Sequence, residues 1–154
     1  GLGLDVGGVV QPAEMEGERR LGYQLLDLGS GEQRTLARRL PEGEQVDGLG
    51  YSFDQESWAW AGRRVRAALG RADVVALDEL GRLEARGQGH MPALQAALKT
   101  GGPAALLLAV RADQAKAIQQ RLGAFDLVSP PDATEPDQDA FLKQIRLSVH
   151  LSGK

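Results

Sequence analysis

The chain has 154 residues, a formal net charge of −3 and no cysteine. This length fits one domain over residues 1–154, because two domains would each approach the size at which a core becomes marginal. The acidic balance argues against a general nucleic-acid binder, and the lack of cysteine excludes disulfides and thiolate metal sites. The longest apolar run, residues 104–110, is too short to span a bilayer. We therefore expect a cytoplasmic protein with no membrane or nucleic-acid partner.

The first fifty residues predict short strands separated by turns. An apolar run over residues 7–12 ends in a proline, as a strand entering a loop does. A hairpin is predicted over about residues 21–40, because two apolar stretches flank the turn signal Gly29-Ser30-Gly31. The segment over residues 13–20 is polar and is predicted as a charged loop, and residues 41–50 as a second loop.

A change of hydrophobic period then predicts an amphipathic helix. Apolar residues recur at spacings of three and four: Trp58, Ala61, Val65, Ala68 and Leu69. Asp54 is the predicted N-cap and Gly70 the predicted end. Trp58 belongs to this apolar stripe, and we interpret Trp60 as a helix-packing residue rather than a platform for a base.

Strands and helices alternate from there to the end of the chain. Three apolar strands are predicted, at residues 74–77, 104–110 and 125–128. Helices are predicted at residues 90–98, 113–122 and 137–147. This alternation indicates the α/β class, with a parallel sheet covered by helices on both faces.

The pair Asp78-Glu79 closes the first of these strands. Ligands of open parallel sheets bind at the carboxyl ends of the strands, so the pair lies where an active site is expected. An apolar strand followed by Asp-Glu is typical of nucleoside triphosphatases, in which the first carboxylate holds Mg²⁺ and the second activates water. The alternative is an apolar strand that ends in two solvated carboxylates.

Further segments carry a family resemblance. The run over residues 78–84, DELGRLE, resembles the DEIGKMEL-type motif of the thermophile-type nucleoside-triphosphatase (THEP) family. Gly8-Val9-Val10, the segment EGERRLGY over residues 16–23 and the segment LGYSFD over residues 49–54 are similar to that family's other landmarks, in the same order. The resemblance implies a P-loop NTPase-like (RecA/AAA-like) three-layer sandwich, with a mostly parallel sheet and a β-hairpin insertion.

The resemblance also implies an activity and site residues. The complete protein would hydrolyse ATP, GTP and other nucleoside triphosphates with Mg²⁺ and loose base preference, with Asp78 in the metal shell and Glu79 as the general base. Arg20, Arg82 and Arg111 are candidate nucleotide-binding residues. Each has an alternative interpretation: Arg20 as an exposed hairpin residue, Arg82 as the partner of Glu84, and Arg111 as a structural residue.

The sequence departs from the family in one respect. It contains no G-x-x-x-x-G-K-[ST] loop, whose backbone N–H groups and lysine cradle a triphosphate. In the family this loop precedes the segment matching Gly8, so we expect Gly1 to lie just after a missing first helix and the sheet to have an open central position. We expect the printed chain alone not to hydrolyse ATP at a useful rate.

Two other functions remain open. The chain could be a non-catalytic binding or regulatory module that keeps the frame, or a Mg²⁺-dependent phosphotransferase that uses only carboxylates. His90 and His150 have no metal-ligand spacing, and we expect neither to be functional.

Overall fold

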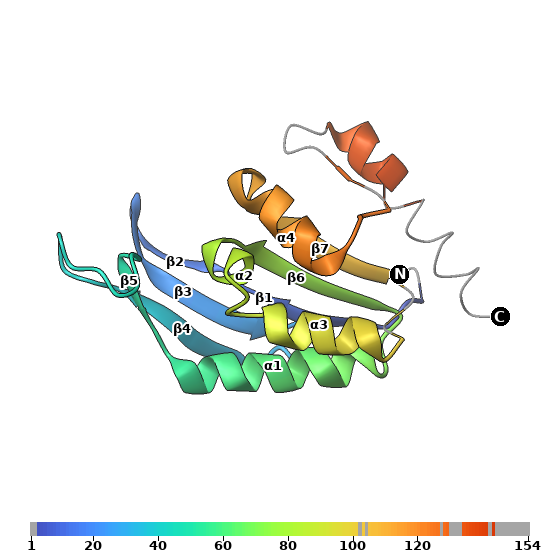
Figure 1. Cartoon of the computed structure of the whole chain (residues 1–154), viewed down its shortest axis with the longest axis horizontal. Helices are drawn as coiled ribbons and strands as arrows, with labels where there is room; N and C mark the ends of the chain where they lie inside the picture. Colours follow the sequence, from blue (N-terminus) through green and yellow to red (C-terminus); the bar gives the residue numbers. More distant parts are fainter. Residues whose placement is uncertain are drawn as a thin grey trace.

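A single sheet organises the chain (Figure 1). The computed structural model describes residues 3–101, 103, 105–126, 128–129, 134–141 and 143. The strands are β1 (Val6–Val10), β2 (Ala13–Glu16), β3 (Arg19–Asp27), β4 (Gln33–Arg39), β5 (Tyr51–Phe53), β6 (Val74–Leu80) and β7 (Ala105–Val110). The helices are α1 (Gln55–Leu69), α2 (Arg82–Ala85), α3 (Met91–Lys99) and α4 (Ala115–Leu122), with a 3₁₀ turn, η1, at Ala112–Gln114. The α/β class predicted from the sequence is confirmed.

The sheet has a parallel and an antiparallel part. Its order is β5-β4-β3-β1-β6-β7, with β2 paired to β3. Among the described strands, β1–β6 and β6–β7 are parallel, whereas the other four pairings are antiparallel. The sheet is therefore mixed rather than mostly parallel, because the hairpin strands continue it instead of forming a separate insertion. The prediction that the sheet has an open central position is also wrong for the described strands. β1 pairs with β6 and β6 pairs with β7, so no gap separates these three strands.

The hairpin predicted over residues 21–40 is present as β3 and β4. The charged segment before it is not the predicted loop, because residues 13–16 form β2 and pair with β3. Its side chains are mostly exposed and include two glutamates. A polar strand on a sheet edge lacks the apolar alternation from which strands are predicted.

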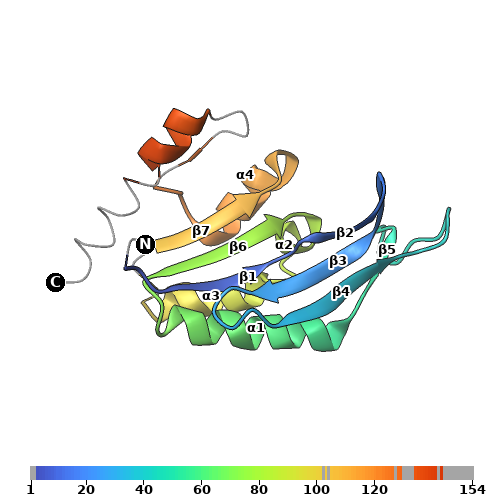
Figure 2. The ribbon, with the colours of Figure 1, turned by 180° about the vertical axis from the view of Figure 1, so that it is seen from behind.

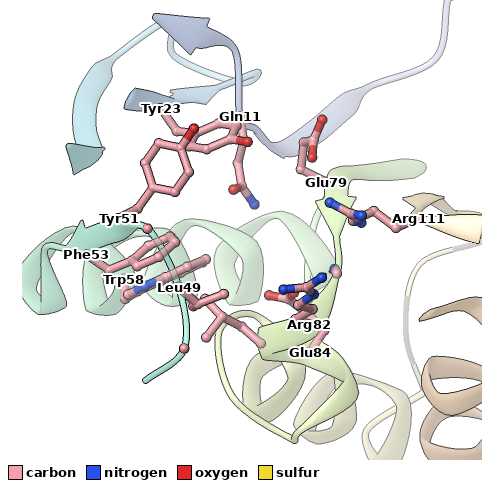
Figure 3. A pocket seen from close by; sticks show the side chains of 14 residues that line it. Gln11, Tyr23, Leu49, Tyr51, Phe53, Trp58, Glu79, Arg82, Glu84 and Arg111 are labelled. Carbon is pink, nitrogen blue, oxygen red and sulfur yellow. The ribbon is translucent and has the colours of Figure 1, made fainter. Parts of the chain in front are cut away.

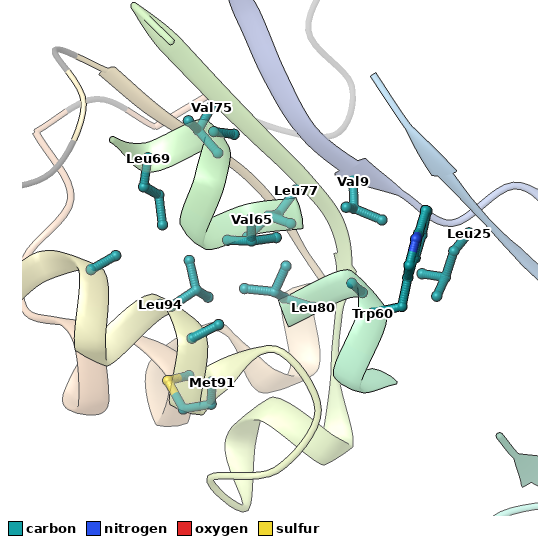
Figure 4. Packing of buried hydrophobic residues seen from close by; sticks show 14 of the residues in the cluster. Val9, Leu25, Trp60, Val65, Leu69, Val75, Leu77, Leu80, Met91 and Leu94 are labelled. Carbon is teal, nitrogen blue, oxygen red and sulfur yellow. The ribbon is translucent and has the colours of Figure 1, made fainter. Parts of the chain in front are cut away.

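Helix α1 has the predicted boundaries and covers the middle of the sheet. The Asp54 carboxylate caps it by accepting the Ser57 backbone N–H at 2.9 Å, and Gly70 ends it. Gly7 of β1 allows close packing, because a Cβ there would lie 2.7 Å from the Ala68 Cβ. Figure 4 shows the core between this helix, α3 and the sheet, with Val65, Leu77 and Leu94 at its centre. Trp60 is 4% exposed, which confirms it as a packing residue.

The described helices α1 to α4 lie on one face of the sheet (Figure 2). Helix α3 contacts α1, α2 and α4, so the four form one layer. The second helical layer expected of a three-layer sandwich is not found among them. The strand predicted at residues 125–128 is not formed by residues 125, 126 and 128, and residue 127 lies outside the described residues. Residues 135–141 and 143 are helical, whereas the remainder of the helix predicted over 137–147 also lies outside the described residues.

Candidate active site

Three parallel strands bring the predicted site residues to one edge of the sheet. Asp78 and Glu79 lie near the carboxyl end of β6, Gln11 directly follows β1, and Arg111 directly follows β7. Because β1, β6 and β7 are parallel neighbours, these side chains meet at the same edge. The Asp-Glu pair therefore lies at the carboxyl edge of the parallel strands, where the sequence predicted it.

Glu79 has an unusual backbone conformation. Its φ is +55°, in the left-handed region that non-glycine residues rarely adopt. The pairing of β6 with β7 shifts register between Leu77 and Leu80, so the strand bulges around Glu79. A bulge re-aims a side chain, and left-handed backbone costs about 1 kcal/mol at a residue with a Cβ. The result is an exposed Glu79 carboxylate that lines a pocket, instead of a side chain packed on the sheet.

Asp78 is half-buried, and Gln11, the residue directly after β1, binds its carboxylate. The Gln11 backbone N–H donates to Oδ1 of Asp78, and the Gln11 side-chain amide donates to the Asp78 carbonyl at 3.3 Å. Burial raises the pKa of the Asp78 carboxyl, and the adjacent Glu79 charge raises it further, while the Gln11 N–H favours the charged form. The two carboxylates thus differ in environment, Asp78 being partly desolvated and Glu79 facing solvent.

A pocket of about 250 Å³ opens beside Glu79 (Figure 3). Its charged lining includes Glu79, Arg82 and Arg111. Its aromatic lining comes from the other half of the sheet and from α1: Tyr23, Tyr51, Phe53 and Trp58. Residues 48–50 complete the lining on this side. The pocket therefore joins two carboxylate residues, Glu79 and Glu84, with two guanidinium groups and a set of rings.

The three predicted arginines differ in position. Arg82 and Arg111 both line the pocket, and Arg111 forms a two-pronged ion pair with Asp113 at 3.1 and 3.3 Å. Arg20 is not among the lining residues. Its guanidinium donates to the Tyr23 hydroxyl at 2.7 Å and lies 5.2 Å from the centre of that ring. Arg20 therefore contacts a residue of the pocket wall without lining the pocket itself.

Glu84 is not the partner of Arg82. It is 2% exposed, and its two carboxylate oxygens accept the backbone N–H groups of Gly81 at 2.9 Å and His90 at 3.0 Å. Burial raises the pKa of the Glu84 carboxyl, and the two N–H groups offset part of this effect. Glu84 thus fixes the turn that follows the Asp-Glu pair and leaves the Arg82 guanidinium facing the pocket.

His90 is buried behind the pocket, as part of a polar network that the sequence did not predict. It is 1% exposed, and its Nε2 lies 3.0 Å from the Gln11 amide nitrogen. Burial lowers the pKa of His90 to about 4, so the ring is neutral at pH 7. With Gln11 donating to Nε2, the ring proton is on Nδ1, which has no hydrogen-bond partner within the described part of the chain. His90 therefore fixes the Gln11 side chain.

Trp58 also contributes to the site, although its spacing predicted only a core role. The ring packs against the core but is half-buried, and it lines the pocket. Its neighbours Tyr51 and Phe53 are two residues apart on β5 and so point to the same side. The Tyr-x-Phe alternation just before an aromatic first helical turn is a signal from which this wall could have been predicted.

The residues at the strand ends fit one mode of Mg²⁺ binding. The described residues contain no group of three or more acidic or histidine side chains that could hold a metal ion. A single carboxylate is sufficient where Mg²⁺ keeps several waters and is shared with substrate phosphates. The donor set around Asp78 therefore fits Mg²⁺ bound together with a triphosphate, and not a site made by the protein alone.

In the described part of the chain, no helix has the length and apolar character needed to cross a membrane.

Comparisons with known proteins show the family of the chain. A protein-family model described as NTPase matches residues 1–145. Nucleoside-triphosphatase THEP1 of Methanopyrus kandleri is 30% identical over 126 residues, which are 82% of this chain and 69% of that protein. Nucleoside-triphosphatase THEP1 of Methanothermobacter thermautotrophicus is 30% identical over 84 residues, 54% of this chain and 48% of that protein.

A solved structure supports the fold separately. The solution structure of a human cancer-related nucleoside triphosphatase superposes with a TM-score of 0.63 over 97% of this chain and 84% of the human chain, at 24% sequence identity. This is the P-loop NTPase-like fold predicted from the sequence. Because the family model matches nearly the whole chain and the Methanopyrus relative matches most of it, the chain belongs to the THEP-type family of NTPases.

Proposed function

We propose that this chain provides the catalytic edge of an enzyme that hydrolyses nucleoside triphosphates to the diphosphate and phosphate. One observation carries the proposal: Glu79 is held in a left-handed conformation at the end of β6, exposed, and beside Arg82 and Arg111. A carboxylate facing solvent, with cations beside it, is the arrangement needed to activate water next to a phosphoryl group.

In the proposed reaction Glu79 is the general base. It accepts a proton from a water molecule whose oxygen forms the new bond to the γ-phosphorus, while the bond from that phosphorus to the β–γ bridging oxygen breaks. Arg82 and Arg111 line the same pocket, where they would stabilise negative charge on the transferred group. The Asp113 ion pair holds the Arg111 guanidinium in a defined orientation.

Asp78 is the proposed ligand of Mg²⁺, directly or through a water molecule. When bound, Mg²⁺ would neutralise charge on the β- and γ-phosphate oxygens. Gln11 contributes by fixing the Asp78 carboxylate through a backbone N–H. This assignment rests on the half-buried carboxylate at the strand end and on the donor chemistry that Mg²⁺ prefers.

Turnover also needs groups that hold the triphosphate. The printed sequence contains no G-x-x-x-x-G-K-[ST] loop, so we expect the printed chain alone to have little activity. Mg²⁺-dependent phosphate release by the printed chain, lost on Glu79→Gln, would contradict that expectation. Substrates with different bases and a cytoplasmic location remain predictions.

The alternative is a binding or regulatory module without catalysis. Such a module would gain nothing from a glutamate in left-handed backbone, which costs about 1 kcal/mol relative to a glycine at the same place. The conformation of Glu79 therefore favours the enzyme.

The experiment compares phosphate release by the full-length native protein and two variants. Glu79→Gln keeps the side-chain size but cannot accept the proton, so we expect kcat to fall at least roughly 100-fold with little change in KM. Glu56→Gln on the exposed first turn of α1 is the matched control and should retain wild-type kcat. Equal kcat values for the wild type and Glu79→Gln would overturn the proposed role of Glu79.

A further inference from the structure

We infer that the aromatic wall of the pocket, to which Trp58 contributes, binds the flat ring of a nucleoside by stacking. The inference deepens the proposed function and rests on it, because it assigns the part of the same pocket that lies away from the carboxylates. It names a ligand class for side chains that the proposed hydrolysis does not use.

The Trp58 ring is held in place from two sides. His90 contacts it edge-on, with ring centres 4.5 Å apart and planes at 77°, and His90 is itself fully buried. Phe53 stacks on it at 6.0 Å and 21°. Yet Trp58 remains half-buried and lines the pocket. A ring fixed by its neighbours and still partly exposed is suited to stacking, because little side-chain entropy is lost when a ligand binds.

Two tyrosines extend this wall. Tyr51 precedes Phe53 by two residues on β5, and Tyr23 of β3 packs against Tyr51 with ring centres 5.3 Å apart. Both line the pocket with Trp58 (Figure 3). The wall is thus made by β3, β5 and α1, three elements fixed to one another by sheet pairing and by helix packing.

The chemistry of the pocket divides into two parts. Figure 3 shows Glu79 and Arg111 on one side and the rings of Tyr51, Phe53 and Trp58 on the other. Inorganic phosphate alone would leave the rings in contact with water, and a purely apolar ligand would leave the Arg82 guanidinium in the same pocket unused. A ligand with a phosphate at one end and a flat ring at the other satisfies both parts, and a nucleotide has that composition.

Two polar side chains beside the rings already have partners. The Tyr23 hydroxyl accepts from Arg20, and the Gln11 amide is shared between the Asp78 carbonyl and His90. With these two groups engaged, we expect recognition to rely on the faces of the rings more than on hydrogen bonds to the edge of a base. Stacking of this kind tolerates different bases, since every base has a π-face. Purine and pyrimidine nucleosides should bind with affinities within about tenfold of each other.

Trp58 itself can report the binding. The chain has two tryptophans, so Trp60→Phe leaves Trp58 as the only one, and Trp58→Phe leaves the buried Trp60 as the control. We expect adenosine and cytidine to quench Trp58 fluorescence saturably, and ribose to have no effect. The Trp60 reporter should not respond. Thermal melts check that both variants are folded. No quenching of Trp58 by either nucleoside would overturn the inference.

Turnover measurements on the full-length native protein show which ring is bound. If it is the base of the hydrolysed nucleotide, Trp58→Leu should raise KM for ATP about tenfold, while the inhibition constant of inorganic tripolyphosphate stays unchanged. If it belongs to a second nucleotide, AMP should quench Trp58 without competing with ATP. Phe53→Leu, which removes the other stacked ring, repeats the comparison should Trp58→Leu be poorly folded.

The two proposals fail in different ways. An unchanged KM for ATP in both variants, together with no quenching, would overturn ring binding and leave hydrolysis intact. Saturable quenching in a full-length protein that releases no phosphate would overturn the proposed hydrolysis and leave ring binding intact.

Discussion

Gln11, directly after β1, donates its backbone N–H to the carboxylate of Asp78 near the end of β6. The contact joins residues 67 positions apart, and it depends on the parallel register that places Val9 beside Leu77. The Gln11 side chain continues the connection to His90, whose backbone N–H is held by Glu84. The proposed metal ligand is thereby tied to the turn after β6 through buried groups.

The left-handed conformation of Glu79 predicts an unusual order of stability. Glu79→Gly should be more stable than Glu79→Ala by about 1 kcal/mol, because a glycine adopts positive φ without a steric cost. Arg63, exposed in the interior of α1, is the matched control, and there the alanine variant should be the more stable by about 1 kcal/mol. Urea unfolding of the four variants measures both differences. The same order at both positions would contradict the strained backbone.

Gly8 should be intolerant of a side chain. Its φ is +115°, and a Cβ would lie 2.0 Å from the Ala76 carbonyl oxygen on the paired strand β6. Gly8→Ala should therefore lower the free energy of unfolding by at least about 3 kcal/mol. Gly43 has a φ of +86° with no atom within 4 Å of such a Cβ, so Gly43→Ala isolates the backbone effect and should cost about 1 kcal/mol. Equal losses would show that β1 and β6 are not packed this closely.

Glu84 should contribute to the stability of the fold, because its buried carboxylate accepts two backbone N–H groups. Glu84→Gln replaces one acceptor oxygen by an N–H₂ group that faces a backbone donor, so we expect a loss of about 2 kcal/mol. Glu42→Gln, on an exposed loop, should change the unfolding free energy by less than about 0.5 kcal/mol. Denaturant unfolding at pH 7 compares the two, and a Glu84→Gln variant as stable as the wild type would contradict the assigned capping role.

His90 predicts how stability changes with pH. Its pKa is lowered from 6.5 to about 4 in the folded chain, so between these values the unfolded chain binds more protons. The contribution of His90 is complete above pH 6.5 and is lost as the pH falls toward 4. When the pH falls from 7 to 5, the loss of this contribution should lower the unfolding free energy by about 2 kcal/mol.

Replacing His90 tests this directly. A His90→Gln variant should lose less stability than the wild type between pH 7 and pH 5, as measured by urea unfolding at both values. Glu84 acts in the opposite sense, since the raised pKa of its carboxyl makes stability fall as the pH rises above 4.5. Identical slopes for His90→Gln and the wild type would show that His90 is not buried in its neutral form.

The sequence predicted best what depends on local pattern. The alternation of apolar strands with amphipathic helices indicated the α/β class, and Asp54 and Gly70 marked the ends of α1 correctly. The position of Asp78 and Glu79 followed from the rule that parallel strands end at one edge of a sheet. These predictions required no knowledge of how the strands pair.

What the sequence did not predict depends on pairing and close packing. β2 carries charged residues on a sheet edge and has no apolar alternation. The conformation of Glu79 arises from a register shift against β7, which no local pattern encodes. Trp58 and His90 are in contact although they lie more than thirty positions apart in the sequence, so no local spacing indicated this contact. Arg20 stays a candidate nucleotide-binding residue: it does not line the pocket, but its guanidinium contacts the Tyr23 ring that does.

The central claim is that Asp78 and Glu79 have separate roles, and Mg²⁺ titrations of phosphate release by the full-length native protein test it most directly. Asp78→Asn should raise the Mg²⁺ concentration needed for half-maximal rate, because a metal ligand is lost. Glu79→Gln should leave that concentration unchanged and lower the rate at saturating Mg²⁺ at least roughly 100-fold. A wild-type saturating rate for Glu79→Gln, or a shift in its Mg²⁺ dependence as large as that of Asp78→Asn, would contradict the account.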